Sequence, residues 1–306
     1  MARFSKLMLG TAQFGMNYGA ANISGKPSFD TVKTILKHAY DGGVTALDTA
    51  PEYGDSEEVI GRALKELGLS DRFRIVSKIP AIPDGAEPET FMEQSILKSL
   101  KRLQMDSLAA ILLHVEKDSI HLDALKQLKA KGLAENAGIS LNTLAHADDG
   151  ADADCLQVPA SLLDHRFDRC FGQGSRHCFV RGAYLQGMLL MPEEKVFIPE
   201  VLERRKQLEK LGIPMAELAL RYLFAKADPK SVLTGVETLA QLRENLRIAQ
   251  LPPLESGNVA AIERIMQSPL PEICVSPYFW PQYKKEHGIF RLEVVRTDPS
   301  KHGQIR

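Results

Sequence analysis

Four polar side chains follow apolar, strand-like segments in the first part of the chain. Asp48, Lys78 and His114 each end such a segment. Tyr53 lies five residues beyond Asp48, in a loop that contains proline, glutamate and glycine. If the three segments are neighbouring parallel strands of a barrel, their carboxyl ends face one common mouth. We therefore expect the four side chains to meet there.

These residue types suit one chemistry when they lie together. A free tyrosine has a pKa of about 10 and is a poor acid at neutral pH. A lysine ammonium beside it favours the phenolate and lowers that pKa, and an aspartate beside the lysine holds its charge in place. A histidine near the phenol can hydrogen-bond an arriving oxygen. The set suits protonation of a carbonyl oxygen while a hydride reaches its carbon. Singly, each residue is more typical of a loop or of packing.

The elements that must position these residues alternate along the chain. Apolar strand-like runs occupy residues 6–11, 44–48, 73–78, 107–114, 134–140, 155–160, 178–185 and 230–235. Segments with helical periodicity occupy residues 28–43, 55–68, 88–104, 119–132, 141–147, 200–211, 215–226 and 238–249. Eight strands alternating with helices predict an α/β fold, a (β/α)8 TIM barrel. An open, doubly wound sheet is the alternative, but its G-x-G-x-x-G fingerprint is absent after the first strand.

We expect a single barrel domain over residues 1–306, with residues 268–306 as a C-terminal extension near the active-site mouth. This extension contains a dense apolar cluster, from Pro277 to Trp280. Such a cluster rarely stays in solvent. Two arrangements remain open at this point: the cluster packs against the side of the barrel, or it folds over the mouth and walls the substrate pocket.

Composition excludes several classes of protein. The 306 residues are 44% hydrophobic and 25% charged, with a formal net charge of −1, so no basic surface for nucleic acid is indicated. No apolar run approaches the roughly 20 residues of a membrane helix, and the start is too weakly apolar for a secretory signal. The four cysteines form no CxxC pair, which favours reduced thiols in a cytoplasmic protein. No H-x-x-x-H metal motif and no G-x-S-x-G elbow occurs.

The stretch LDTAPEYGDSEEVIGRAL, with SKIP and LLHV downstream, resembles the aldo-keto reductase superfamily. The resemblance extends over about Leu7 to Leu251. It implies a barrel that reduces aldehydes or ketones with a nicotinamide cofactor and without a metal. It further implies Tyr53 as the general acid, Lys78 as the residue that tunes its pKa, Asp48 as support and His114 as the residue that orients the substrate.

The resemblance also implies a cofactor site. Ser140 and Gln157 match residues that hold the nicotinamide carboxamide, although the usual asparagine partner is replaced by Leu141. Arg181 stands where a residue stacks on the ring, and the segment after 235 matches an adenosine-binding turn and helix. The implied cofactor contacts are Gly10, Thr11, Ser140, Gln157, Arg181, Gly235, Glu237, Thr238, Gln241, Glu244 and Asn245.

The adenosine-side turn bears on cofactor preference. Relatives that prefer NADP usually carry a lysine or arginine near its start, whereas this chain has Val236 and Glu237. A carboxylate repels a 2′-phosphate and can accept a hydrogen bond from a ribose hydroxyl. We therefore expect NADH to be accepted at least comparably to NADPH.

The expected substrate is a small aldehyde, ketone or sugar carbonyl, and the sequence does not identify it further. Loops around Phe14 and Tyr18, around Glu52, after His114 and near Trp280 should form its pocket. The substrate contacts predicted from these loops are Phe14, Tyr18 and Trp280. One alternative is a cofactor-binding sensor or regulatory subunit with vestigial catalysis, which turnover of an aldehyde would exclude. Another is a metal-dependent barrel lyase or epimerase. Oligomeric state is not predicted.

Overall fold

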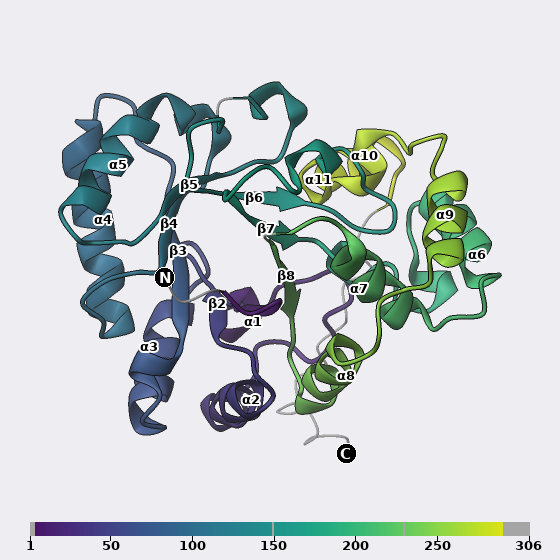
Figure 1. Ribbon diagram of the computed structural model, residues 1–306, viewed down its shortest axis with the longest axis horizontal. Helices are drawn as coiled ribbons and strands as arrows, with labels where there is room; N and C mark the ends of the chain where they lie inside the picture. The colour runs from purple at the N-terminus through teal and green to yellow at the C-terminus, as the bar shows by residue number, and fades with distance from the viewer. Residues whose placement is uncertain (1–3, 149, 229, 290–306) are drawn as a thin grey trace, which may run out of the picture.

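The computed structural model describes residues 4–148, 150–228 and 230–289 (Figure 1). Its eight strands are parallel and close a barrel in chain order, which confirms the predicted (β/α)8 fold. The strands are β1 Leu7–Gly10, β2 Ala46–Asp48, β3 Arg74–Ile79, β4 Ala110–Leu113, β5 Ala137–Ser140, β6 Cys155–Pro159, β7 His177–Arg181 and β8 Lys230–Gly235.

Helices cover the outside of this barrel. The α-helices are α1 Ala12–Gly15, α2 Phe29–Asp41, α3 Ser56–Glu66, α4 Pro88–Leu103, α5 Leu122–Ala130, α6 Pro199–Glu209, α7 Met215–Ala225, α8 Leu239–Ala249, α9 Ser256–Ile265, α10 Glu272–Val275 and α11 Trp280–Glu286. The 3-10 helices are η1 Ser70–Arg72, η2 Glu116–His121, η3 Leu144–His146, η4 Asp168–Cys170, η5 Leu185–Gly187, η6 Glu193–Lys195 and η7 Pro277–Phe279.

Local chemistry explains the helix boundaries. Ser28 begins α2 by accepting a hydrogen bond from the backbone of Thr31, and one face of that helix is buried. Glu87 caps α4 in the same way by accepting from Thr90, and the left-handed residue Gln104 ends it. These two helices begin and end close to the predicted positions, because polar caps and an apolar stripe are both local signals.

Three parts of the sequence-based assignment differ from the structure. The strand predicted to reach Leu185 ends at Arg181, because Gly182 adopts a φ of +80° that a strand does not accommodate. The helix predicted over 141–147 is reduced to the turn η3. Helices α1 and α9 were not predicted, and the extension after 268 contains α10 and α11 in its described part. Residues 290–306 of that extension lie outside the described residues.

The register aligns the carboxyl ends of the strands. Gly10 is opposite Asp48 on one side and opposite Gly235 on the other. Ser140 is opposite Gln157 in the next part of the barrel. Residues predicted for the site therefore lie at one level, as a closed parallel barrel requires.

The barrel interior is filled by apolar side chains rather than left open. The inward-facing cluster consists of Met8, Ala46, Val76, Ala110, Leu112, Cys155, Phe179 and Leu233. All four cysteines are buried and free. Burial raises the pKa of Cys178 to about 12 and that of Cys274 to about 11. These thiols are therefore unreactive at neutral pH, since the thiolate is the reactive form.

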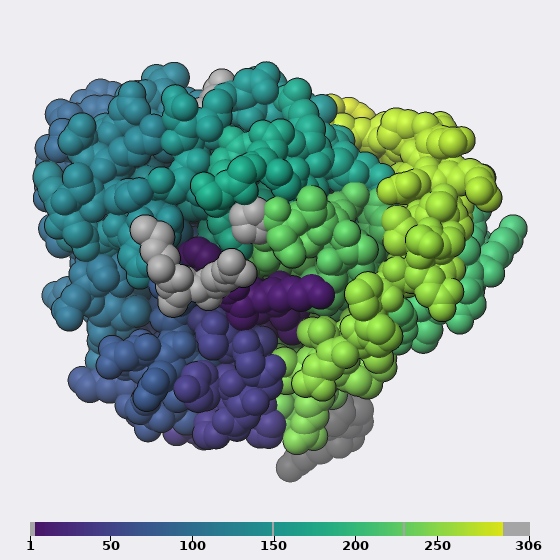
Figure 2. All heavy atoms as spheres, viewed as in Figure 1, coloured from purple at the N-terminus to yellow at the C-terminus, as the bar shows by residue number. Residues whose placement is uncertain are grey.

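The C-terminal helices pack against the segments that follow the carboxyl ends of β6 and β7, where Trp280 shares a hydrophobic cluster with Leu163 and Leu185. Helices α9, α10 and α11 gather with α6 on one side of the molecule (Figures 1 and 2), where α6 contacts both α9 and α10. Trp280 is only 4% exposed, donates to the carbonyl of Cys274 at 3.3 Å and packs edge-on against Phe197. The predicted substrate contact of Trp280 is therefore not observed, because its indole belongs to this hydrophobic core.

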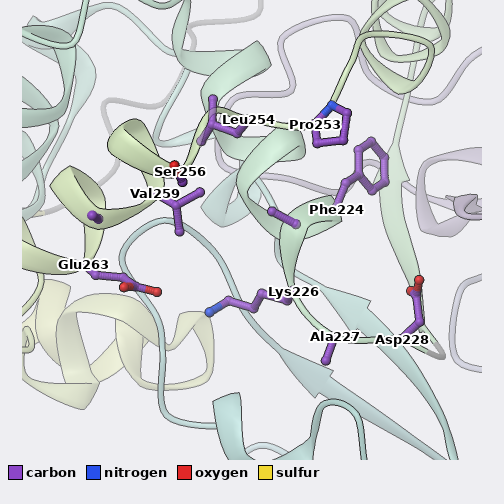
Figure 3. Close-up of a pocket in the computed structure, with 11 residues that line it drawn as sticks. Phe224, Lys226, Ala227, Asp228, Pro253, Leu254, Ser256, Val259 and Glu263 are labelled. Atoms are coloured by element: carbon purple, nitrogen blue, oxygen red, sulfur yellow. The ribbon is translucent and has the colours of Figure 1, made fainter.

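A surface groove of about 600 Å³ lies between the end of α7, the segment leading into β8, and α9 (Figure 3). Lys226 and Asp228 line it, and the segment they occupy enters the amino end of β8. In a barrel of this kind that end is opposite the mouth that carries the chemistry. The groove is thus separate from Asp48 and its neighbours. In the described part of the chain, no helix is long and apolar enough to cross a membrane.

Candidate active site

The buried pair Asp48 and Lys78 forms the base of the site. The Nζ atom of Lys78 lies 2.8 Å from both carboxylate oxygens of Asp48 and 2.8 Å from the carbonyl oxygen of Thr49. Neither side chain is more than 5% exposed. The ammonium therefore uses its three donors on fixed acceptors, and its position is well determined.

Tyr53 and His114 lie over this pair. The Nζ atom of Lys78 is 4.8 Å from the ring centroid of Tyr53. The rings of Tyr53 and His114 meet edge to face, with centroids 5.9 Å apart and planes at 82°. The structure thus brings together all four residues that the strand ends were expected to deliver.

The pKa of Tyr53 is raised in the folded protein, whereas the neighbouring lysine was expected to lower it. Lys78 does act to lower the pKa of the phenol, but burial has the larger effect and the pKa of Tyr53 is raised overall. Burial also acts to lower the pKa of Lys78, yet Asp48 and Tyr53 outweigh it and raise that pKa. At neutral pH the site therefore holds a protonated phenol beside a charged ammonium, which is the proton-donating form.

His114 is neutral at physiological pH. Burial, assisted by the positive charges of Lys78 and Arg181, lowers its pKa to about 3. Its Nδ1 atom lies 2.5 Å from Oε2 of Glu52, although the geometry is not that of a hydrogen bond. Glu52 was expected to line the pocket, but its contact with His114 was not predicted.

A chain of polar contacts connects Asp48 with the opposite side of the barrel. Gln157 donates from Nε2 to Oδ1 of Asp48 at 2.6 Å. Ser140 donates to Oε1 of Gln157 at 3.4 Å, a long contact. Arg181 donates to the carbonyl oxygen of Leu141 at 2.7 Å and to the side chain of Asn142. The polar residues at the ends of β5, β6 and β7 thus converge toward the base of the site.

The turn after β1 holds the Tyr53 loop in place. Thr11 donates from Oγ1 to the carbonyl oxygen of Asp48 at 2.8 Å, and Ser56 donates to Oγ1 of Thr11 at 2.9 Å. A Cβ atom on Gly15 would lie 1.8 Å from the carbonyl oxygen of Tyr53, and one on Gly54 would lie 2.4 Å from the carbonyl oxygen of Gly15. The two backbones can approach this closely only because both residues are glycine.

This contact leads to a prediction for Gly15→Ala. The added methyl group must displace the backbone of Tyr53, so we expect kcat to fall at least about tenfold, since a shift near 1 Å at a reacting group can cost a hundredfold. Overpacking should also lower the free energy of unfolding by about 1–3 kcal/mol. Steady-state kinetics and urea denaturation measure the two effects.

The matched control is Gly257→Ala in α9, where a Cβ atom meets nothing within 4 Å. A helical glycine replaced by alanine should gain about 0.5–1 kcal/mol of stability and leave kcat unchanged. Equal kinetics for the two variants would show that Gly15 does not position Tyr53.

The turn after β8 is closed by a capping box at the start of α8. Gln241 accepts hydrogen bonds from the backbone N–H groups of Glu237 and Thr238, at 2.7 and 3.1 Å. Thr238 accepts in return from the backbone of Gln241 at 3.3 Å. These two N–H groups are donors of the kind that bind an anion at a helix start. Because Gln241 is exposed, its side chain can move away and leave these two N–H groups free to bind a ligand.

The other two residues implied on α8 have partners within the protein. Glu244 forms an ion pair with Arg247 at 2.8 Å. Asn245 is 4% exposed and accepts a hydrogen bond from Tyr184 at 2.7 Å. Asn245 therefore lies in the packing between α8 and the segment that follows β7, and the predicted adenine contact is not visible for it.

Of the three predicted substrate contacts, one is exposed. Tyr18 is 39% exposed, accepts a hydrogen bond from Gln186 at 3.1 Å and lies within electrostatic range of Tyr53 and Arg181. Phe14 is fully buried in the core between the barrel and its helices. Like Trp280, Phe14 is buried among other side chains, so its predicted substrate contact is not observed. Among the described residues, no group of histidine, cysteine and acidic side chains could hold a metal ion.

Comparison with known proteins bears on this arrangement. A sequence profile of the Aldo/keto reductase family matches residues 6–171 and 194–267. The D-arabinose 1-dehydrogenase of Saccharomyces cerevisiae is 29% identical over 282 residues, which cover 79% of this chain and 82% of the yeast protein.

Solved structures show the same fold. The aldo-keto reductase AKR11C1 of Bacillus halodurans, in its holo form, matches 88% of this chain and 94% of its own, with a TM-score of 0.72 and 23% identity. An aldo/keto reductase of Klebsiella pneumoniae, solved in complex with NADP and acetate, matches 88% of this chain and 93% of its own, with a TM-score of 0.67 and 22% identity.

Proposed function

This chain belongs to the aldo/keto reductase family, and from that premise we propose that it transfers a hydride between a nicotinamide cofactor, NADH or NADPH, and an aldehyde, ketone or sugar carbonyl. The observation that carries the proposal is the convergence of Asp48, Lys78, Tyr53 and His114 at the mouth of the barrel. A sugar is included because the yeast relative is named D-arabinose 1-dehydrogenase.

Tyr53 has the central role in this proposal. As a hydride reaches the carbonyl carbon, the C=O double bond becomes a single bond and its oxygen takes the proton from the Tyr53 hydroxyl. The phenolate left behind is stabilised by the Lys78 ammonium, which lies 4.8 Å from the ring centroid. Asp48 holds that ammonium, and solvent then returns a proton to Tyr53. In the oxidative direction Tyr53 acts as the base.

The residues around the site fit a nicotinamide cofactor, which supplies the hydride when bound. Ser140 and Gln157 lie opposite each other on β5 and β6 and offer a hydroxyl and an amide. The hydrogen bond between them is long, at 3.4 Å, so a carboxamide of the cofactor can replace it. Gly10 and Gly235 lie side by side at the ends of β1 and β8, and the side-chain amide of Gln13 fills the space that a Cβ atom on Gly235 would occupy. The start of α8 has two backbone donors for a phosphate, covered by Gln241.

A panel of aldehydes, ketones and aldoses tests the proposal. Purified protein is incubated with each carbonyl compound and with NADH or NADPH in parallel, and cofactor oxidation is followed by absorbance. We expect turnover of at least one compound, abolished in Tyr53→Phe and insensitive to a metal chelator. Tight cofactor binding without turnover of any compound would instead favour a sensor or regulatory subunit.

Cofactor preference gives a second prediction. Glu237 lies half-buried at the turn that precedes α8. A unit charge at about 4 Å and an effective dielectric near 20 corresponds to about 4 kcal/mol. Solvent exposure reduces this to about 1 kcal/mol, roughly a fivefold preference. We therefore expect NADH to bind at least as tightly as NADPH, and Glu237→Arg to shift the ratio of dissociation constants toward NADPH.

Titration of the protein with both reduced cofactors, read by fluorescence, measures these constants. Glu203→Arg is the matched control, because it makes the same charge reversal on the exposed face of α6. NADPH binding tenfold tighter than NADH in the unmodified protein would contradict the role given to Glu237.

A further inference from the structure

Arg181 is a charged side chain at the mouth that the proposed proton transfer does not use. It is the last residue of β7, and its guanidinium reaches past the end of β6 to the segment that follows β5. There it donates to the carbonyl oxygen of Leu141 at 2.7 Å and to the side-chain oxygen of Asn142. Both acceptors are neutral. The two hydrogen bonds therefore hold the guanidinium in place without cancelling its charge.

The carboxylates around Arg181 are paired with other cations. Asp48 and Asp164 are the carboxylates that act on it electrostatically. Asp48 lies 2.8 Å from the ammonium of Lys78, and Asp164 lies 2.7 Å from the guanidinium of Arg166. Burial lowers the pKa of Arg181, but a guanidinium stays protonated in proteins at neutral pH. In the described part of the chain, Arg181 therefore brings a positive charge to the site without a carboxylate of its own.

The charge of Arg181 acts on the reacting centre. Arg181 lies within electrostatic range of Tyr53 and helps to lower the pKa of His114. It is also anchored on Leu141, which directly follows Ser140, a residue proposed to hold the carboxamide of the cofactor. A ring that delivers a hydride to a carbonyl group bound at Tyr53 must lie among these same residues. The charge state of that ring and the charge of the guanidinium therefore affect each other.

We propose that Arg181 is a specificity-determining residue that makes the site bind the reduced nicotinamide cofactor more tightly than the oxidised one. The nicotinamide ring is neutral when reduced and positively charged when oxidised, so a fixed cation beside it repels only the oxidised form. A unit charge about 6 Å away, at an effective dielectric near 20, changes a binding constant roughly a hundredfold before screening. The carboxylate of Glu52 opposes this effect, but it is 49% exposed, so solvent screens its charge.

The selection has a functional consequence, and it rests on the proposed use of a nicotinamide cofactor. A reductase whose site repels the oxidised ring takes up NADH or NADPH even when oxidised cofactor is abundant, and its oxidised product inhibits it weakly. Arg181 also connects β7 with the segment after β5. Loss of that connection alone would weaken the binding of both forms equally, whereas loss of the charge changes the ratio of their dissociation constants.

Isothermal titration calorimetry of the purified full chain with NADH, NAD⁺, NADPH and NADP⁺ measures this ratio without turnover. In the unmodified protein we expect the oxidised forms to bind at least tenfold more weakly than the reduced forms. Arg181→Gln, which removes the charge, should lower that ratio at least fivefold. Arg181→Lys, which keeps the charge but not the planar set of donors, should preserve it within about twofold. Arg264→Gln is the matched control, because it removes an exposed cation from α9, and it should leave the ratio unchanged.

Two results would overturn the proposal: a ratio below about threefold in the unmodified protein, or a ratio that Arg181→Gln leaves unchanged while both dissociation constants rise. Arg181→Met, a neutral side chain of similar length, replaces Arg181→Gln if that variant does not fold, and the ratio in the unmodified protein decides if neither variant folds. Equal binding of both forms contradicts only the role of Arg181. Failure to bind either form of either cofactor would also contradict the proposed function.

Discussion

Replacing Tyr53 with phenylalanine is expected to lower kcat by at least about a hundredfold, the lower end of the contribution of general acid catalysis. The ring and its edge-to-face contact with His114 are kept, so the pocket should not change shape. Only the proton donor is lost. The dissociation constant of the cofactor should therefore stay within about twofold of that of the unmodified protein. Steady-state kinetics with the best substrate of the panel and fluorescence titration provide the two measurements.

Tyr40→Phe is the matched control, because it removes a hydroxyl from a tyrosine on α2 whose ring packs against Phe73, away from the mouth. It should leave kcat within a few-fold of the original value. Near-normal turnover by Tyr53→Phe would mean that the proton comes from elsewhere. The assignment of the general acid would then be wrong, whatever the substrate.

Lys78→Met is expected to damage both catalysis and stability. Without the ammonium, nothing stabilises the phenolate that forms at Tyr53, so kcat should fall about as far as in Tyr53→Phe. The buried carboxylate of Asp48 is also left with Gln157 as its remaining hydrogen-bond donor among the described contacts. Breaking a buried ion pair in this way costs about 3–5 kcal/mol. Kinetics and urea denaturation separate the two losses.

The double variant Asp48→Asn/Lys78→Met further distinguishes the loss of activity from the loss of stability. It removes the unpaired charge, so it should recover much of the stability and none of the activity. Because the pKa of Lys78 is raised in the folded protein, the pair contributes at neutral pH and is lost only in strongly alkaline solution. A Lys78→Met variant with a changed KM and an unchanged kcat would contradict its role.

The barrel and the four central residues could be predicted because their signals are local. Each strand is a short apolar run with a turn at either end, and Asp48, Lys78 and His114 are polar residues at or just after the carboxyl ends of their strands. Once the strands are parallel and neighbouring, the meeting of these side chains follows from the topology. The start of α2 could be predicted for the same reason, because Ser28 caps the helix through a contact with Thr31, only three residues away.

Burial and pairwise contacts could not be predicted in the same way. Phe14 and Trp280 are large and apolar, and such residues suit a pocket wall and a core equally well until their neighbours are known. The net pKa shift of Tyr53 depends on how deeply the phenol lies, which residue type does not specify. Glu52 and His114 meet only because the loops after β2 and β4 converge.

The way the barrel closes has a consequence for the order of folding. Every strand pairs with its neighbour in sequence except at the seam, where β1 must find β8 across most of the chain. Forming that seam carries the largest loop-closure entropy, so it is expected late. The turn after β1 also carries Thr11 and Gly15, against which the Tyr53 loop is fixed. During refolding, recovery of activity should therefore lag behind recovery of helical signal, and enzyme assays would report the moment at which the seam closes.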